Sequence, residues 1–286
     1  MSLRLPSCAG LSRAFEEAPL GTAERVDTWL LQELPAPWIR DPLTDPHLPA
    51  PLYDRARSFL RETQHPRVVF IRRDACVLKP TIIRVRSAGT PPTTEIVAPL
   101  DEAGVVSMGD RLLFLVCTHG QHDSCCGTFG YPVYATLRAL APADVWQCSH
   151  IGGDRFAANI VVLPWGLYFG HVAVSEVEVL VEHLRRRDVP LRWFRGRSTL
   201  SRPAQVGEIY LRREGILHGM QPPRVTSVER RSDSAWRVVI HDATNAFSVD
   251  FREERAAVAR RLTCGATEEG MPREYRLLSV QKQAAI

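Results

Sequence analysis

Residue types that bind soft metals are concentrated in one stretch of the chain, residues 117–159. Four of the seven cysteines and three of the nine histidines fall within it. They form a first group of Cys117, His119, His122, Cys125 and Cys126 and a second group of Cys148 and His150. Thiolate is a ligand that iron–sulfur clusters and zinc both accept, and imidazole also suits these metals. The stretch therefore predicts a metal or iron–sulfur site.

The spacing within the first group favours a [2Fe–2S] cluster over zinc. Such a cluster needs four protein ligands, and two histidines can replace two cysteines on one iron. Cys117 and Cys126 lie nine positions apart, across a loop that contains Gly120 and could wrap a cluster. The short C-x₂-C pairs that are typical of zinc sites are missing from the sequence. We therefore predict that Cys117 and Cys126 are ligands, the alternative being that they pack as small hydrophobic residues.

The second group offers several further ligands. Cys148, His150 and Asp154 surround Gly152 and Gly153, and glycine lets the backbone approach a cluster closely. If they are not ligands, His150 would be a polar loop residue and Asp154 would cap the loop or pair with an arginine. We expect His119 and His122 to be polar loop residues or supports of the ligands. Cys8, Cys76 and Cys264 are expected to be isolated, structural cysteines.

A strand is expected immediately before each ligand group. The residues of this region predict strands and helices in the order β-α-β-β-β-α: a buried strand at Asp110–Val116, a helix that starts at Pro132, a strand at Val145–Gln147, a hairpin of Asn159–Leu163 and Leu167–Val172, and a helix from Ser175 through Arg187.

The regions on either side of this segment have a different order of predicted helices and strands. Residues 1–21 look like a loose arm, and the elements predicted after it are helices at Thr22–Glu33 and Tyr53–Glu62 and strands at Arg67–Arg72, Thr81–Val85 and Thr94–Ala98. Beyond residue 200 we expect a helix at Ala204–Glu214 and antiparallel strands at Val225–Arg230, Arg237–Asp242, Phe247–Phe251 and Tyr275–Val280. The chain thus divides into an N-terminal α/β region (1–105), a central domain (106–200) and a C-terminal α+β region (201–286).

Composition narrows the class of protein. Almost all of the positive charge behind the net charge of +4 is arginine, since Lys79 and Lys282 are the only lysines. We do not take the arginine count as a sign of nucleic-acid binding. No apolar run approaches the length of about 18 residues that spans a membrane, and no signal peptide is recognised. We expect a cytoplasmic protein, whose clustered cysteines serve metal or redox chemistry rather than disulfides.

Three segments carry a resemblance to a known family. CTHGQHDSCCG at 117–127, CSHIGGDRFAAN at 148–159 and VVLPWGLYFGHV at 161–172 resemble the sucrase/ferredoxin-like family and, more distantly, thioredoxin-like [2Fe–2S] ferredoxins. In those ferredoxins one cysteine pair follows the first strand. A second pair, with three residues between its members, precedes a Pro-x-Gly-x-Tyr hairpin. Cys117 and Cys126 match the first pair, His150 and Asp154 stand at the second, and Pro164, Gly166 and Tyr168 match the hairpin.

The resemblance implies a fold, a cofactor and a function. It implies a thioredoxin-like α/β ferredoxin domain with a mixed sheet at 106–200. One [2Fe–2S] cluster would be held by Cys117, Cys126, His150 and Asp154. Eukaryotic members resemble this arrangement with histidine at both positions of the second pair. Carboxylate is a harder ligand than thiolate, so Cys148 and Cys125 stay open as alternatives to Asp154.

The implied protein is an electron carrier rather than an enzyme, with an unidentified redox partner protein and with no nucleic-acid or membrane partner. The arginine tract at 185–202 could dock an acidic partner or could be a solvated helix end. Two other functions remain open. One is a thiol-redox enzyme with Cys117, Cys125 or Cys126 as nucleophile, although the usual C-x-x-C is missing. The other is a zinc-binding structural module.

Overall fold

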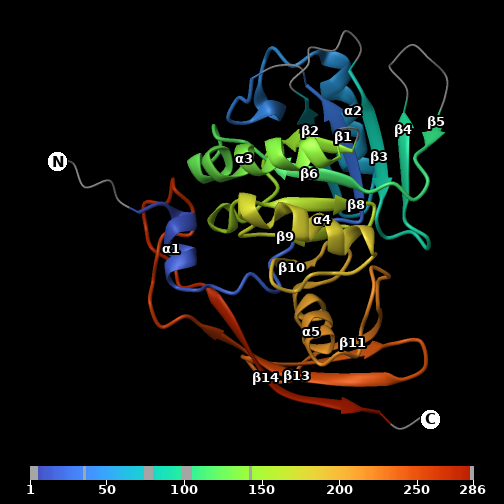
Figure 1. Ribbon diagram of the computed structural model, residues 1–286, viewed down its shortest axis with the longest axis vertical. Helices are drawn as coiled ribbons and strands as arrows, with labels where there is room; N and C mark the ends of the chain where they lie inside the picture. Colours follow the sequence, from blue (N-terminus) through green and yellow to red (C-terminus); the bar gives the residue numbers. More distant parts are fainter. Residues whose placement is uncertain (1–5, 35–36, 74–79, 98–104, 142–143, 284–286) are drawn as a thin grey trace.

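The computed structural model describes residues 6–34, 37–73, 80–97, 105–141 and 144–283. These residues form a mixed α/β protein with two β-sheets (Figure 1). The larger is a ten-stranded mixed sheet in the order β10-β9-β8-β6-β7-β2-β1-β3-β4-β5, and the smaller is a four-stranded antiparallel sheet in the order β11-β12-β13-β14.

The central part of the chain has the predicted order β-α-β-β-β-α. Its elements are β6 (Leu113–Cys117), α3 (Ser124–Leu140), β7 (Val145–Cys148), β8 (Ile160–Leu163), β9 (Leu167–Phe169) and α4 (Val177–Arg185). β6 is parallel to β7 and antiparallel to β8. All five residues of β6 are buried, which confirms the prediction of a strand covered on both faces. Helices α3 and α4 lie on the same face of this part of the sheet (Figure 1).

The N-terminal strands continue the same sheet. β1 (Thr28–Glu33) is parallel to β2 (Pro66–Arg72) and antiparallel to β3 (Ile82–Arg86), which is followed in the sheet by β4 (Thr93–Val97) and β5 (Val105–Ser107). β2 joins the central strands by pairing with β7, with Ile71 opposite Cys148. Helix α2 (Ala50–Glu62) confirms the predicted helix at 53–62. It packs on β2.

The predicted helix at Thr22–Glu33 is wrong. Residues 28–33 form β1, and residues 22–27 before it form neither helix nor strand. β1 lies between two other strands and is buried on both faces, so its apolar residues do not alternate with polar ones. A strand of this kind cannot be distinguished from a buried helix by periodicity alone. The supposed cap, Thr22, instead accepts a hydrogen bond from Arg195 Nε through its hydroxyl oxygen (3.1 Å).

Helix α3 begins eight residues earlier than predicted. Asp123 caps it, because its carboxylate accepts a hydrogen bond from the backbone N–H of Cys125 (2.8 Å). Pro132, the expected start, lies inside the helix, where its missing N–H removes one backbone hydrogen bond without ending the helix. As a result, Cys125 and Cys126 belong to the first helical turn rather than to a loop.

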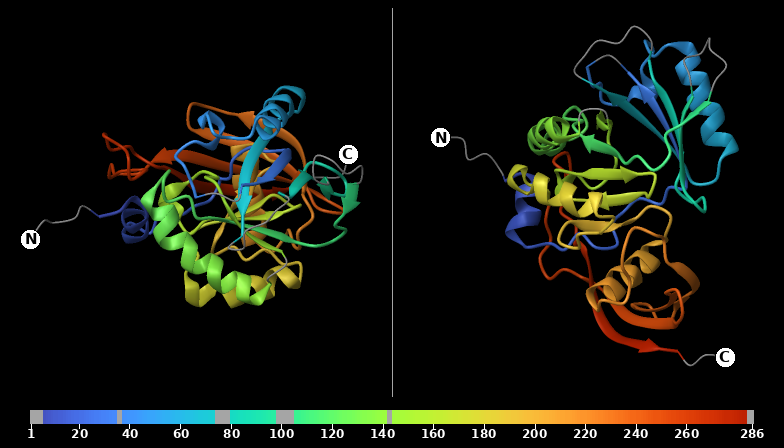
Figure 2. Two further views of the ribbon diagram at one scale, coloured as in Figure 1. Left: turned by 90° about the horizontal axis from the view of Figure 1, so that it is seen from above. Right: turned by 45° about the vertical axis from the view of Figure 1, so that its right-hand side comes forward.

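The remaining elements include α1 (Cys8–Ala14), which lies within the expected loose arm, and β10 (Phe194–Arg197) at the edge of the large sheet. The C-terminal region consists of α5 (Arg202–Arg213), β11 (Arg224–Arg230), β12 (Ala235–His241), β13 (Ala246–Arg255) and β14 (Arg273–Lys282). The predicted helix and antiparallel strands of this region are confirmed. Helix α5 covers the four-stranded sheet, which lies apart from the large sheet (Figure 2). None of the helices in the described ranges is long and apolar enough to cross a membrane.

Candidate metal centre

The two ligand groups of the sequence meet at one end of the large sheet. Cys117 and Cys148 lie opposite each other, at the carboxyl ends of the parallel strands β6 and β7. The chain leaves β6 into the loop that leads to Cys126, and it leaves β7 into the loop that carries His150 and Asp154. Because parallel strands end at the same edge of a sheet, the two loops are brought side by side.

The structure brings all four predicted ligands together. The ligand atoms of Cys117, Cys126 and His150 all lie within 4.8 Å of one another. Asp154 lies against two of these residues, with its Oδ1 3.4 Å from Cys126 Sγ and 3.0 Å from His150 Nδ1. Asp154 is 5% exposed and His150 is 22% exposed, whereas the two cysteines are almost fully buried. A set of two sulfurs, one imidazole and one carboxylate is a suitable donor set for a metal.

One polar atom in this group lacks a hydrogen bond. His150 Nε2 accepts from the backbone N–H of Gly152 (3.1 Å), but Nδ1 is buried and has no hydrogen-bond partner among the described residues. Its neighbour is Asp154 Oδ1, which lies 3.0 Å from Nδ1 in an ion pair. Nδ1 is thus buried beside a carboxylate and close to the sulfur atoms of Cys117 and Cys126. This position fits a metal ligand once the ring proton has left.

The acid–base properties of the four residues depend on one another. Cys117 has a pKa well below its usual range, chiefly because Cys126 donates a hydrogen bond to its sulfur and because His150 is close. The pKa of Cys126 is raised by that same hydrogen bond and by burial. Burial lowers the pKa of His150, but Asp154 and the Cys117 thiolate outweigh it and raise the pKa to about 9. The group thus holds negative charge on Cys117 and Asp154, and a bound metal cation would replace the protons on Cys126 and His150.

A glycine that the sequence analysis did not single out brings the first cysteine and α3 together. A Cβ atom on Gly130 would lie 1.9 Å from the carbonyl oxygen of Cys117. The helix can therefore pack directly on the end of β6 only with glycine at this position. In the second loop, Gly152 and Gly153 have positive φ angles of 88° and 79°, which glycine adopts at little cost. The groups that approach them closely are the side chains of Glu24 at Gly152 and of Arg195 at Gly153, and the predicted approach of this backbone to a cluster stays a prediction.

Arg195 supports the second loop from within the protein. Its guanidinium donates to the carbonyl oxygens of Gly152 (2.9 Å) and Thr22 (2.7 Å) and to Asn159 Oδ1 (2.8 Å). Burial lowers the pKa of Arg195 to about 10. The sequence analysis placed Arg195 and Arg197 in a tract that could dock a partner. Both are only 1% exposed, so these two residues cannot contribute to a docking surface.

Neither alternative ligand, Cys148 or Cys125, belongs to the group of converging ligand atoms formed by Cys117, Cys126 and His150. Cys148 is fully buried, and its sulfur is not among the ligand atoms that converge within 4.8 Å; burial raises its pKa. Cys125 Sγ lies 3.6 Å from Cys8 Sγ, which in turn is 3.5 Å from Cys264 Sγ. The expectation that Cys8 and Cys264 are isolated is therefore wrong, while Cys76 lies outside the described residues.

His119 supports His150, whereas His122 lies close enough to be a ligand as well, because the ligand atoms of His122, His150 and Asp154 all lie within 4.8 Å of one another. His119 Nδ1 accepts a hydrogen bond from the backbone N–H of His150 (3.0 Å), and its Nε2 lies 2.7 Å from the carbonyl oxygen of Ile39. Both ring nitrogens of His119 are thus occupied. The ring of His122 stacks on that of His150 with 3.8 Å between centroids. A surface cavity of about 410 Å³ is lined by His119, His122, His150, Arg40 and Phe70, among others, so the centre can be approached from this side.

Comparisons with known proteins agree with this geometry. The profile of the family described as Sucrase/ferredoxin-like matches residues 19–196, which is more than half of the chain. The chain belongs to the sucrase/ferredoxin-like family. The match includes both ligand loops and Arg195, whereas the four-stranded sheet lies beyond it.

The chain also aligns with part of a protein that has a name. The chain is similar to Altered inheritance of mitochondria protein 32 of Eremothecium gossypii, at 30% identity over an alignment of 112 residues. This alignment covers 33% of the chain and 36% of the relative, so it spans about a third of each protein. Comparison with the solved structures gave no match.

Proposed function

We propose that this member of the sucrase/ferredoxin-like family is an electron carrier that binds one [2Fe–2S] cluster through Cys117, Cys126, His150 and Asp154. The observation that carries the proposal is the convergence of the first three ligand atoms within 4.8 Å, where two parallel strands end. The β-α-β-β-β-α order of residues 113–185 supports the finer assignment of residues 106–200 as a ferredoxin domain of thioredoxin-like fold.

The four side chains suit this cofactor chemically. When bound, the cluster takes up and releases one electron at a time, with a potential that depends on ligand type and burial. Cys117 is already prepared as a thiolate, because Cys126 and His150 stabilise its charge. Cys126 and His150 carry the protons that binding would release. His119 holds His150 in place by accepting a hydrogen bond from its backbone N–H (3.0 Å).

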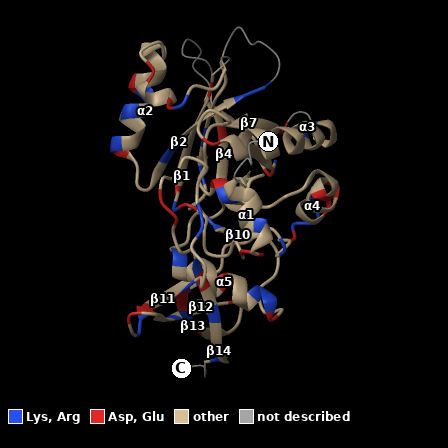
Figure 3. Ribbon diagram, turned by 90° about the vertical axis from the view of Figure 1, so that its left-hand side faces the viewer, with Lys and Arg blue, Asp and Glu red and all other residues tan. Residues whose placement is uncertain are grey.

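The proposal includes a place where electrons enter and leave. His150 is the most exposed of the four ligands, at 22%, and its ring edge borders the cavity with His122 stacked on it. A redox partner protein would dock there. On the side of α1, positive and negative residues are interspersed (Figure 3), which supports a protein without a nucleic-acid partner. We further propose a cytoplasmic location, where thiols remain reduced, and no membrane partner.

A single zinc ion is the second candidate for the same centre. Tetrahedral zinc has Zn–S and Zn–N distances of about 2.3 Å and 2.0 Å, so its ligand atoms lie roughly 3.5–3.8 Å apart. The separations of up to 4.8 Å among Cys117, Cys126 and His150 are close to this range. A thiol-redox enzyme is less well supported, because Cys117 and Cys126 are 1% and 0% exposed and a substrate thiol could not reach them.

Metal analysis of the full chain purified without air tests these functions. We expect about two iron and two acid-labile sulfide per chain and a red-brown colour. Cys117→Ser should abolish the colour. Cys148→Ser, which changes a buried cysteine outside the centre, should keep it. A colourless protein whose zinc is lost in Cys117→Ser would favour the second candidate. A colourless protein with no metal at Cys117, together with a reactive thiol, would favour the enzyme.

A further inference from the structure

A second group of cysteines lies outside the candidate centre. The sulfur atoms of Cys8, Cys125 and Cys264 form a triangle with sides of 3.6 Å (Cys8–Cys125), 3.4 Å (Cys125–Cys264) and 3.5 Å (Cys8–Cys264). The three residues come from α1, from the first turn of α3 and from the segment between β13 and β14. Cys8 and Cys125 are fully buried, and Cys264 is half-buried.

We propose that this group is a structural zinc site in which Cys8, Cys125 and Cys264 are three ligands and Asp123 is the fourth. Sulfur atoms on tetrahedral zinc are about 3.8 Å apart, given a Zn–S distance of about 2.3 Å. The observed triangle is only slightly smaller, so an ion could enter with small outward movements of the side chains. A disulfide is a poorer explanation, because its sulfur atoms are about 2.05 Å apart and three equidistant sulfurs cannot all pair.

Asp123 is held in the orientation that this role needs. Its carboxylate oxygens both lie 3.9 Å from Cys8 Sγ. They accept hydrogen bonds from the backbone N–H groups of Cys125 (2.8 Å) and Cys264 (2.7 Å), two of the proposed ligands. Asp123 is 4% exposed and has no ion-pair partner within the described ranges. These hydrogen bonds hold the carboxylate next to the three sulfur atoms, and a divalent metal would balance its charge together with that of the thiolates.

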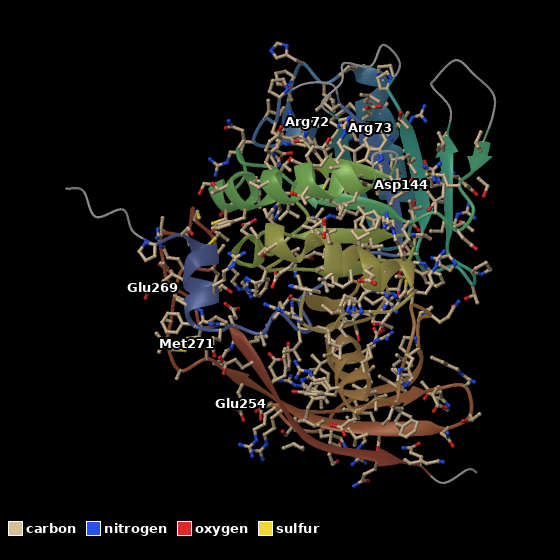
Figure 4. All side chains as sticks on the ribbon, viewed as in Figure 1. Arg72, Arg73, Asp144, Glu254, Glu269 and Met271 are labelled. Atoms are coloured by element: carbon tan, nitrogen blue, oxygen red, sulfur yellow. The ribbon has the colours of Figure 1, made fainter. Side chains whose placement is uncertain are left out.

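The surroundings indicate a structural role. Three segments distant in sequence meet here, and in Figure 4 the labelled Glu269 and Met271 mark the C-terminal segment where it runs beside α1. Glu17, which follows α1 and whose side chain is 2% exposed, pairs with Arg260 of the C-terminal segment (3.3 Å) and with Arg155 of the loop after β7 (2.7 Å). A zinc ion would tie α1 and the C-terminal segment to the first turn of α3 through Cys125, the residue before Cys126. The proposal goes beyond the electron-transfer function and does not depend on it.

Zinc analysis of the full chain, with variants of both sites, tests this inference. The native protein, purified without air, should retain about one zinc per chain. Cys264→Ser and Cys8→Ser should lose it, whereas Cys117→Ser, the matched change in the other centre, should keep it. Asp123→Asn should weaken zinc retention against a competing chelator by at least tenfold. Absence of zinc from the native protein together with no uptake of added Zn²⁺, or zinc lost only in Cys117→Ser, would overturn the proposal.

A measurement on the native protein covers the case in which the variants do not fold. Alkylation of the chelator-treated protein should label Cys264, the half-buried member of the triangle, and stoichiometric Zn²⁺ should slow this labelling at least tenfold. Mass spectrometry of the peptide that contains Cys264 gives the rate. An unchanged rate on adding Zn²⁺ would contradict the assignment, as would a disulfide among the three cysteines in protein that has never met air.

Discussion

Cys125 and Cys126 are consecutive residues in the first turn of α3, yet their sulfur atoms lie in two separate clusters of ligand atoms. Cys126 Sγ lies 3.4 Å from Asp154 Oδ1, whereas Cys125 Sγ lies 3.6 Å from Cys8 Sγ. Adjacent residues of a helix point about 100° apart, so one turn can supply ligands to two sites. Asp123, which caps α3, therefore positions the sulfur atoms of both cysteines.

The two cysteines should respond differently to the same substitution. Cys126→Ser removes a proposed cluster ligand, so the visible absorption should be lost. Cys125→Ser leaves the four cluster ligands unchanged, so the colour should remain while zinc is lost. Visible spectra and metal analysis of the two variants, prepared side by side without air, provide the comparison. The opposite pattern, with colour lost only in Cys125→Ser, would exchange the roles of the two residues.

The fourth cluster ligand can be assigned by a similar pair. Asp154→Ala should lose the cluster or shorten its lifetime in air, because Asp154 contacts both Cys126 and His150. Cys148→Ala should leave the visible spectrum unchanged, since its sulfur lies outside the converging ligand atoms. Absorbance at fixed times after exposure to air measures both. A stable cluster in Asp154→Ala together with a lost cluster in Cys148→Ala would assign the position to Cys148.

The sequence predicts the parts of this fold that depend on local patterns. The strands and hairpin around the ligand groups follow from apolar runs and from Pro164 and Gly166. The strand at 28–33 was missed because its pairing with β2 and β3, which are distant in sequence, decides its conformation. The start of α3 differs from the prediction because Asp123 caps the helix and Pro132, a residue favoured in first turns, is accommodated inside it.

The sequence indicates which residues converge at the candidate centre but not which residues support it. Cys117, Cys126, His150 and Asp154 are close in sequence or match a family pattern. By contrast, Cys8 and Cys264 meet through contacts between the two ends of the chain, which no local spacing reveals. Arg195 was assigned to a surface tract, because nothing in its immediate sequence distinguishes a buried arginine from an exposed one.

Replacing Arg195 should destabilise the protein strongly. Arg195→Met leaves the carbonyl oxygens of Gly152 and Thr22 and the side chain of Asn159 without their buried donor. We expect a loss of about 3 kcal/mol or more in the free energy of unfolding. Arg186→Met is a matched control, because the Arg186 side chain is 73% exposed, and it should change stability by less than about 0.5 kcal/mol. Denaturant titration of both metal-free variants gives the values, and equal effects would argue against the support role.

His171 should make stability depend on pH. Burial lowers its folded-state pKa to about 4, and the nearby Arg13, Arg195 and Arg155 add to the effect. Between about pH 6.5 and 4 the unfolded chain binds a proton at this histidine while the folded protein does not, so stability falls as the pH falls. The loss from pH 8 to pH 5 should be roughly 2 kcal/mol.

A comparison of variants isolates this contribution. His171→Gln removes the titrating group, so the slope of the unfolding free energy between pH 8 and pH 5 should decrease. His47→Gln changes an exposed histidine and should leave the slope as it is. Denaturant titrations at several pH values measure both. A slope in His171→Gln that equals that of the native protein would show that the buried ring does not oppose protonation.

Pulsed electron paramagnetic resonance of the reduced protein tests whether His150 binds a [2Fe–2S] cluster. If a [2Fe–2S] cluster is held by Cys117, Cys126, His150 and Asp154, one-electron reduction should give a paramagnetic signal coupled to a directly bound histidine nitrogen. His150→Cys should keep the paramagnetic signal and lose that coupling. Absence of a paramagnetic signal on reduction would rule out the cluster, and a signal without coupling to a bound nitrogen would rule out His150 as its ligand.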